Sequence, residues 1–230
     1  MKRYVLIAGV NGAGKSTLYQ TLESLHSMPR INMDEIVREF GDWKNPNDVM
    51  KAGRIAVGMI KEYFEKGLSF NQETTLCGRS ILKNIKYAKQ LGYKIELHYV
   101  GIDSAELAKE RIAYRVAHGG HGIPDKDVDR RFVESRKQFK KILPLCDMAV
   151  LYDNTENFYR IAIYKSGHME ILSEKQPNWY TEMSLVNHLP DNQLEEIFGN
   201  IIGSVHDSGK TLEELREERL REKYGDAGKM

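Results

Sequence analysis

A glycine-rich segment near the start of the chain constrains the fold more than any other feature. Residues 9–17 read GVNGAGKST, which fits the pattern GxxxxGK[ST], and they lie between an apolar run at 4–8 and a segment with helical periodicity. A strand, a glycine loop and a helix in this order form a P-loop, whose backbone N–H groups surround phosphate oxygens at the positive end of the helix. The alternative, an ordinary glycine turn after a strand, is the weaker one because motif and flanks agree. We therefore expect the chain to bind a nucleoside triphosphate.

P-loop chemistry assigns roles to the side chains of this motif. Lys15 is expected to reach the β- and γ-phosphates of ATP, and Ser16 is expected to coordinate Mg²⁺. ATP and Mg²⁺ are therefore the expected cofactors. The residues expected to contact the nucleotide are Gly9, Asn11, Gly12, Ala13, Gly14, Lys15, Ser16 and Thr17.

Composition and charge are typical of a cytosolic protein without a general nucleic-acid or membrane surface. The 230 residues carry a formal net charge of +1, which argues against a nucleic acid or an anionic membrane as a general partner. Cys77 and Cys146 have neither metal nor redox spacing, and they are typical of reduced thiols in a cytosolic protein. No apolar run approaches the length of a membrane span.

Strand-like and helix-like segments alternate along the chain, which predicts a mostly parallel central sheet with helices on both faces. We expect strands at 3–8, 30–32, 68–73, 94–102 and 148–152, and helices at 15–25, 47–66, 79–91, 105–117 and 125–143. The segments 159–164 and 169–172 flank Ser166 and Gly167 and predict a hairpin at the edge of the sheet. The expected fold class is therefore α/β, of the P-loop NTPase/kinase-like type.

The character of the sequence changes near residue 186. Residues 210–224 are almost purely charged and begin with a candidate capping box of Thr211 and Glu214. This pattern predicts a kinase-like domain at 1–185 and a charged helical tail at 186–230. The tail is either a solvated helix or a partner-binding one.

Elements diagnostic of other P-loop classes are missing from the sequence. It contains no Asn-Lys-x-Asp element of the kind that recognises guanine in GTPases, and no serine-glycine signature of ABC ATPases. The arginine sensors of ring ATPases are not evident either. A compact kinase-like arrangement is the class that these absences leave.

Two carboxylates are candidates for the acceptor side of such a site. Asp34 follows the expected second strand, where the carboxyl ends of strands border the ligand crevice. A carboxylate there can orient an acceptor hydroxyl and take its proton, although Asp34 could instead cap a helix at 35–40. Glu73 ends the third expected strand, near the Mg²⁺ position, with Thr75 in the loop that follows. The alternative for Glu73 is a surface carboxylate.

Basic residues in the second half of the domain are candidates for a closing lid. Arg111 and Arg115 lie four residues apart and share a helix face, and Arg130 and Arg131 follow a glycine turn. Arginines brought in by closure stabilise charge on a transferred phosphoryl group. We expect Arg111 first and Arg115 second in that role, against the alternative of a solvated basic face. His121, between glycines, either contacts phosphate or has no such role.

Four of these segments together resemble the zeta-toxin family, namely 9–17, 32–34, 72–75 and 111–124. The likeness is closest to a short bacterial branch often described as predicted ABC-type ATPases, and it covers about residues 1–180. It implies a P-loop kinase that uses ATP and Mg²⁺ to phosphorylate a sugar hydroxyl of UDP-N-acetylglucosamine. The resemblance implies roles for six residues: Lys15 at the phosphates, Ser16 at the metal, Asp34 as the base, Glu73 and Thr75 at the substrate, and Arg111 in the lid.

One position departs from the pattern of that family. Some characterised toxins carry a second arginine in the turn before the proline, where this chain has His121. The departure leaves Arg115 and Arg130 as candidates for the missing arginine. It also makes the identity of the acceptor less constrained than the kinase class.

The sequence therefore predicts an ATP- and Mg²⁺-dependent phosphotransferase of the zeta-toxin type. The expected partners are a small-molecule acceptor, with UDP-N-acetylglucosamine as the first candidate, and an antitoxin protein. Two alternatives stay open: a kinase for another small metabolite, and a non-catalytic nucleotide-binding protein that acts through its charged tail.

Overall fold

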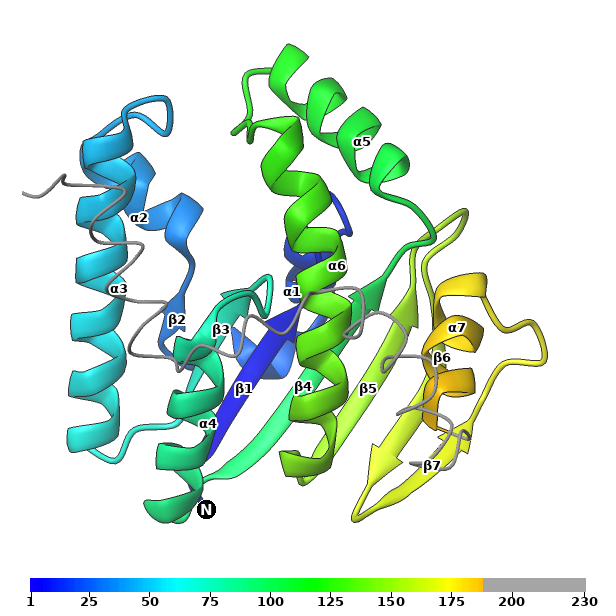
Figure 1. Ribbon diagram of the computed structural model, residues 1–230. Helices are drawn as coiled ribbons and strands as arrows, with labels where there is room; N and C mark the ends of the chain where they lie inside the picture. Colours follow the sequence, from blue (N-terminus) through cyan, green and yellow to red (C-terminus); the bar gives the residue numbers. More distant parts are fainter. Residues whose placement is uncertain (188–230) are drawn as a thin grey trace, which may run out of the picture. The chain divides into compact units, whose positions relative to one another are not determined.

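A seven-stranded sheet in the order β2-β3-β1-β4-β5-β6-β7 organises the fold (Figure 1). The strands are β1 (Arg3–Ala8), β2 (Arg30–Ile31), β3 (Phe70–Thr74), β4 (Lys94–Gly101), β5 (Met148–Asp153), β6 (Tyr159–Lys165) and β7 (His168–Ile171). The pairings among β1 to β5 are parallel, whereas β6 and β7 form an antiparallel hairpin at one edge. The predicted α/β fold with a mostly parallel sheet is confirmed.

The computed structural model describes residues 1–187 of the chain. Met1–Ser184 forms one compact unit. From residue 188 onward the predicted tail, with its capping box of Thr211 and Glu214, lies outside the described residues. Within the described part, no helix is both long enough and apolar enough to cross a membrane.

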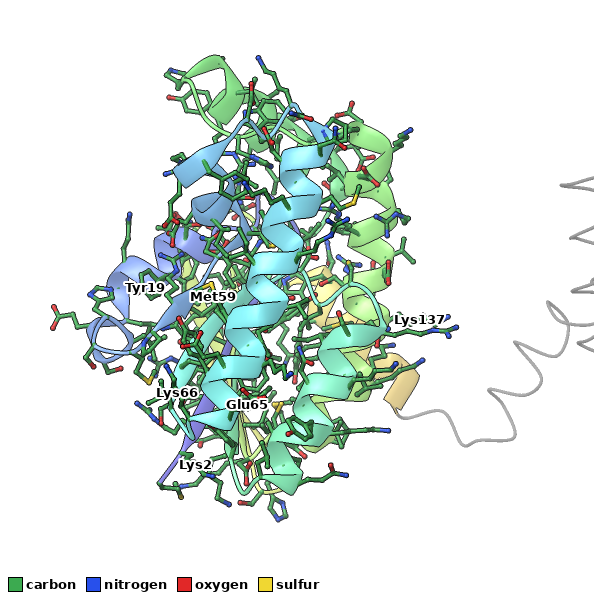
Figure 2. All side chains as sticks on the ribbon, turned by 90° about the vertical axis from the view of Figure 1, so that its left-hand side faces the viewer. Lys2, Tyr19, Met59, Glu65, Lys66 and Lys137 are labelled. Atoms are coloured by element: carbon green, nitrogen blue, oxygen red, sulfur yellow. The ribbon has the colours of Figure 1, made fainter. Side chains whose placement is uncertain are left out.

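Helices cover both faces of the sheet. They are α1 (Lys15–Thr21), α2 (Met33–Phe40), α3 (Pro46–Glu65), α4 (Arg79–Gln90), α5 (Ala105–Ala117), α6 (Asp125–Ile142) and α7 (Asn178–Asn187), with 3-10 turns η1 (Glu23–Leu25) and η2 (Leu143–Leu145). Figure 1 looks onto the face that bears α3, α4, α6 and α7, with α1 behind the sheet. Figure 2 looks onto α3 from the side and shows Glu65 and Lys66 near its C-terminal end.

The two faces follow from the alternation of side chains along β1. Tyr4 and Leu6 point into one core cluster, and Val5 and Ile7 point into the other. All four side chains are fully buried because helices cover both sides of this central strand. A continuous apolar run is thus the expected sequence of a strand that carries a P-loop at its end.

The ends of several elements differ from those expected from the sequence. The helix expected at 15–25 ends at Thr21, because the chain tightens there into the 3-10 turn η1. The strand expected from residue 68 begins at Phe70, because Gly67 and Leu68 complete the end of α3. Their N–H groups donate to the carbonyls of Phe64 and Tyr63, at 3.1 and 3.0 Å.

The helix α7 was not expected from the sequence, and tertiary contacts hold it in place. Trp179 is 1% exposed, and its Nε1 donates to the buried carboxylate of Asp153 at 2.7 Å. Its backbone N–H donates to Asp103 Oδ1 at 2.9 Å. Gly101 leaves the space for the indole, because a Cβ there would lie 2.2 Å from a ring atom.

Removal of this indole should destabilise the domain. We expect Trp179→Ala to lower the free energy of unfolding by about 3–5 kcal/mol, because it opens a cavity and leaves Asp153 without its indole donor. Urea denaturation measures the change. The control Tyr114→Ala removes a ring that is 69% exposed, and should cost about 0.5 kcal/mol or less. Equal losses in the two variants would contradict the anchoring role of Trp179.

Candidate functional site

The P-loop has the backbone that the motif predicts. β1 ends at Ala8 and α1 begins at Lys15. In the loop between them, Gly12 and Gly14 have φ values of 80° and 100°, which favour glycine. A Cβ on Gly9 would lie 2.4 Å from the carbonyl oxygen of Val100, so the loop also packs too closely on β4 for a side chain.

The ammonium group of Lys15 is buried among charges of both signs. Its Nζ donates to the carbonyl of Val10 at 3.1 Å and lies 3.9 Å from Glu73 Oε1. Burial lowers the pKa of Lys15; the carboxylates of Glu73 and Asp34 raise it, and the guanidinium groups of Arg115 and Arg131 lower it further. Cationic side chains from α1, α5 and α6 therefore lie around the P-loop.

The carboxylate of Glu73, on β3, is the centre of a polar network beside the P-loop. Its Oε2 accepts hydrogen bonds from Arg30 Nη2 at 2.8 Å and from Asn32 Nδ2 at 3.0 Å. The hydroxyl of Ser16 lies 3.3 and 3.2 Å from its two oxygens. A hydroxyl and a carboxylate side by side are oxygen donors of the kind that Mg²⁺ prefers, so the residues present fit this ion.

Arg30 holds this network together, and the sequence did not reveal its role. Its side chain is 15% exposed and also pairs with Glu35 Oε1 at 2.8 Å. Its guanidinium lies over the ring of Tyr19, 3.6 Å from the centroid. Arg30 therefore connects β2 with α1, α2 and β3. A strand of two residues offered no pattern from which these contacts could have been inferred.

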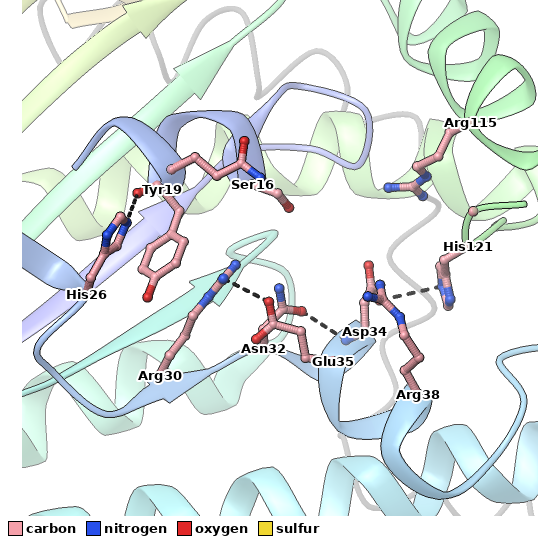
Figure 3. Close-up of a pocket in the computed structure, with 12 residues that line it drawn as sticks. Ser16, Tyr19, His26, Arg30, Asn32, Asp34, Glu35, Arg38, Arg115 and His121 are labelled. Carbon is pink, nitrogen blue, oxygen red and sulfur yellow. Dashed lines mark hydrogen bonds and ion pairs between the residues drawn. The ribbon is translucent and has the colours of Figure 1, made fainter. Parts of the chain in front are cut away.

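Asp34 is available for chemistry because another residue caps its helix. The helix α2 begins at Met33, and Asn32 Oδ1 accepts the backbone N–H of Asp34 at 2.9 Å. The capping role considered for Asp34 therefore belongs to Asn32. The Asp34 carboxylate lies 3.5 Å from His121 Nε2, as Figure 3 shows.

His121 brings the loop between α5 and α6 against Asp34. Its ring lies against that of Trp43, with centroids 5.0 Å apart. Burial lowers the pKa of His121 and outweighs the opposite effect of Asp34, while nearby arginines lower the pKa further. The lowered pKa favours the neutral form of the ring. Gly122 permits this approach, because a Cβ there would lie 2.6 Å from the indole of Trp43.

The two arginines of α5 have different surroundings. Arg111 donates to the carbonyls of Asn154 and Thr155, at 2.7 and 3.0 Å, and so binds the loop after β5. Arg115 has buried Nε and Nη2 atoms without a hydrogen-bond partner in the described structure. This geometry favours Arg115 over Arg111 as the group that contacts a phosphoryl oxygen. Both roles stay predictions.

One cavity of about 1030 Å³ brings most of the predicted residues together. It is lined by Asn11, Gly12, Gly14, Lys15, Ser16, Thr17, Asp34, Glu73, Thr75, Arg111, Arg115 and His121. The other two predicted residues, Gly9 and Ala13, are buried residues of the P-loop itself. A second cavity, of about 530 Å³, shares Ser16, Asp34 and Arg115 with the first and is drawn in Figure 3.

Comparison with known proteins identifies the family of the chain. The model of the AAA_33 family, described as an AAA domain, matches residues 5–139, which is more than half of the chain. The chain belongs to the AAA_33 family. The match includes the P-loop, α2, β3 and most of α6, and it supports binding of a nucleoside triphosphate. An uncharacterized protein of Haemophilus influenzae is 34% identical over 129 residues, which cover 56% of this chain and 91% of that protein.

Two solved assemblies contain chains with the same fold. A chain of the AvrRxo1-ORF1:AvrRxo1-ORF2 complex solved with sulphate ions is similar with a TM-score of 0.60 and 16% identity, and the complex solved with ATP gives 0.59 and 15%. The first of these matches covers 80% of this chain but only 63% of that one. A chain of the PezAT chromosomal toxin–antitoxin system of Streptococcus pneumoniae gives a TM-score of 0.54 at 17% identity, covering 86% and 88% of the two chains. Identities this low show the fold alone.

Loss of the Arg30 guanidinium should destabilise the fold and disturb Glu73. We expect Arg30→Gln to lower the free energy of unfolding by about 1.5–3 kcal/mol, because it removes charged hydrogen bonds to two carboxylates. Urea denaturation measures the change. The matched control is Arg3→Gln, which removes an ion pair to Glu96 at 3.3 Å from a side chain that is 38% exposed. That control should cost under about 1 kcal/mol. A cost for Arg30→Gln no larger than that of the control would show that the network is dispensable.

Proposed function

We propose that the protein is an ATP- and Mg²⁺-dependent phosphotransferase of the zeta-toxin type. It transfers the γ-phosphoryl group of ATP to a hydroxyl of a small acceptor, with UDP-N-acetylglucosamine as the first candidate. The observation that carries this proposal is the position of Asp34, whose carboxylate lines the same cavity as Lys15 and Ser16. A group able to accept a proton therefore faces groups able to hold a triphosphate.

The donor half of the proposed site consists of the P-loop and Glu73. Backbone N–H groups of the loop and the ammonium of Lys15 hold the β- and γ-phosphates. Ser16 and Glu73 would hold Mg²⁺, which when bound offsets the negative charge of the phosphates. Arg30 and Asn32 keep the Glu73 carboxylate beside Ser16.

In the transfer step, the acceptor oxygen attacks the γ-phosphorus while the bond to the β,γ-bridging oxygen breaks. ADP leaves with the electron pair of that bond, and the proton of the acceptor hydroxyl passes to Asp34. Arg115 stabilises the charge that develops on the γ-phosphoryl oxygens, since its buried Nε and Nη2 have no partner in the described structure. Arg111 fixes the loop after β5 at the donor side.

We assign the acceptor half of the site to the surroundings of Asp34. His121 lies beside Asp34 and against Trp43, and Thr75 lines the same cavity. The sequence resemblance to zeta toxins supports a nucleotide sugar as acceptor. That resemblance, and the shared fold with chains of the PezAT and AvrRxo1 assemblies, supports an antitoxin as protein partner. The cytoplasm is the proposed location, consistent with the free thiols of Cys77 and Cys146.

A coupled assay of ADP release tests the proposed reaction. We expect the full chain to convert ATP and UDP-N-acetylglucosamine into ADP and a phosphorylated sugar nucleotide, and to stop when EDTA removes Mg²⁺. Lys15→Ala should abolish transfer because the phosphates lose their buried cation, whereas Lys61→Ala, on the exposed side of α3, should not change it. Background ADP across a panel of sugar nucleotides would exclude that acceptor class. Background ADP across a wider metabolite panel would favour the non-catalytic alternative.

Replacement of Asp34 separates proton transfer from nucleotide binding. We expect Asp34→Asn to lower kcat by about 10²–10⁴-fold, because the amide cannot take the proton of the acceptor. Its affinity for ATP, measured by calorimetry, should stay close to that of the unmodified chain. The control Asp129→Asn changes a half-exposed carboxylate that pairs with Lys109, and should leave kcat unchanged. An unaltered kcat in Asp34→Asn would reject Asp34 as the base.

A further inference from the structure

Two consecutive arginines at the start of α6 have opposite surroundings. Arg130 is exposed, and its guanidinium is shared between Asp127 Oδ1 at 3.1 Å and Glu134 Oε2 at 2.9 Å, both on its own helix. Arg131 is partly buried, and its Nη1 donates to Asn11 Oδ1 at 3.1 Å. Neighbours on a helix point about 100° apart, so Arg130 follows the helix surface while Arg131 reaches across to the P-loop.

The contact of Arg131 is weak for a partly buried cation. The carboxamide oxygen of Asn11 is a neutral acceptor, and a charged oxygen would bind the guanidinium more strongly. Among the described residues, no ion pair to a carboxylate is formed by the Arg131 side chain. A phosphoryl group at the P-loop would offer the charged oxygens that this guanidinium lacks.

The charges around the P-loop point to the same conclusion. Both Arg115 and Arg131 are close enough to Lys15 to lower its pKa. The carboxylate of Glu73, beside Lys15, already accepts hydrogen bonds from Arg30 and Asn32. The space before the loop is therefore rich in cations, as expected for a site that binds several phosphates.

We propose that Arg131 moves from Asn11 to the γ-phosphoryl group of the bound triphosphate and stabilises its oxygens during transfer. This inference rests on the proposed function and makes Arg131 a catalytic residue. Arg131 would take the place of the arginine that some zeta toxins carry where this chain has His121. The guanidinium of Arg130 is instead paired with Asp127 and Glu134 of its own helix. The lowered pKa of His121 disfavours a positive charge at that position.

Affinities for di- and triphosphate test the contact without any acceptor. The probes are ADP and the β,γ-imido analogue of ATP, each with Mg²⁺, titrated calorimetrically into the full chain. In Arg131→Gln, the ratio of the affinity for the triphosphate analogue to the affinity for ADP should fall about tenfold, because a charge-assisted hydrogen bond to the γ-phosphoryl group disappears. The neighbouring variant Arg130→Gln should keep the unmodified ratio. A preserved ratio in Arg131→Gln, or an equal loss in Arg130→Gln, would overturn the inference.

Two further measurements separate this contact from a structural role and from the reaction itself. Arg131→Lys keeps the positive charge but loses the planar guanidinium group, so it should recover part of the preference for the triphosphate analogue over ADP. Its melting temperature should equal that of the unmodified chain. With an active acceptor, Arg131→Gln should lower kcat by about a hundredfold and leave the KM of the acceptor unchanged. A chain that transfers phosphate to no acceptor would reject the proposed function, whereas the ratio of affinities would still decide whether Arg131 contacts the γ-phosphoryl group.

Discussion

The carboxylate of Glu73 is the interaction on which the candidate site depends. It lies at the end of β3, beside the end of β1, and accepts from Arg30, Asn32 and Ser16. These partners come from β2, the cap of α2 and the start of α1, so one group sets the spacing of four elements. A buried ionic network of this kind contributes more to geometry than to net stability, because desolvation of its charges offsets much of their attraction.

An excess of positive charge surrounds this network on the side of the lid. Lys15, Arg115 and Arg131 approach from three elements, and neither arginine has a carboxylate partner among the described residues. The P-loop, α5 and α6 are thus assembled around a space suited to polyphosphate. Asp34 brings negative charge to the same cavity, and a carboxylate there is able to accept the proton of a hydroxyl.

Much of the fold could be predicted from the sequence because its signals are local. The strands β1 and β5 are largely apolar runs, and β4 alternates apolar and polar residues over its first half. The helices α5 and α6 begin and end close to the expected residues. The ends of α1 and β3 shifted because 3-10 and cap hydrogen bonds, which leave no apolar pattern, decide where such elements stop. The helix α7 was missed, since its position depends on Trp179 contacting Asp153 and Asp103 from distant parts of the chain.

The sequence by itself determined the P-loop and the residue types of the site, because a glycine loop needs particular neighbours within a few positions. It placed Asp34 and Glu73 at strand ends, and both line the cavity. All four arginines line that cavity, namely Arg111, Arg115, Arg130 and Arg131, and only the tertiary structure decided what each of them contacts. Arg111 turns to backbone carbonyls and Arg130 to its own helix, whereas Arg115 and Arg131 face the phosphate-binding loop. The direction of a long side chain depends on partners that lie far away in the sequence, and no spacing rule encodes them.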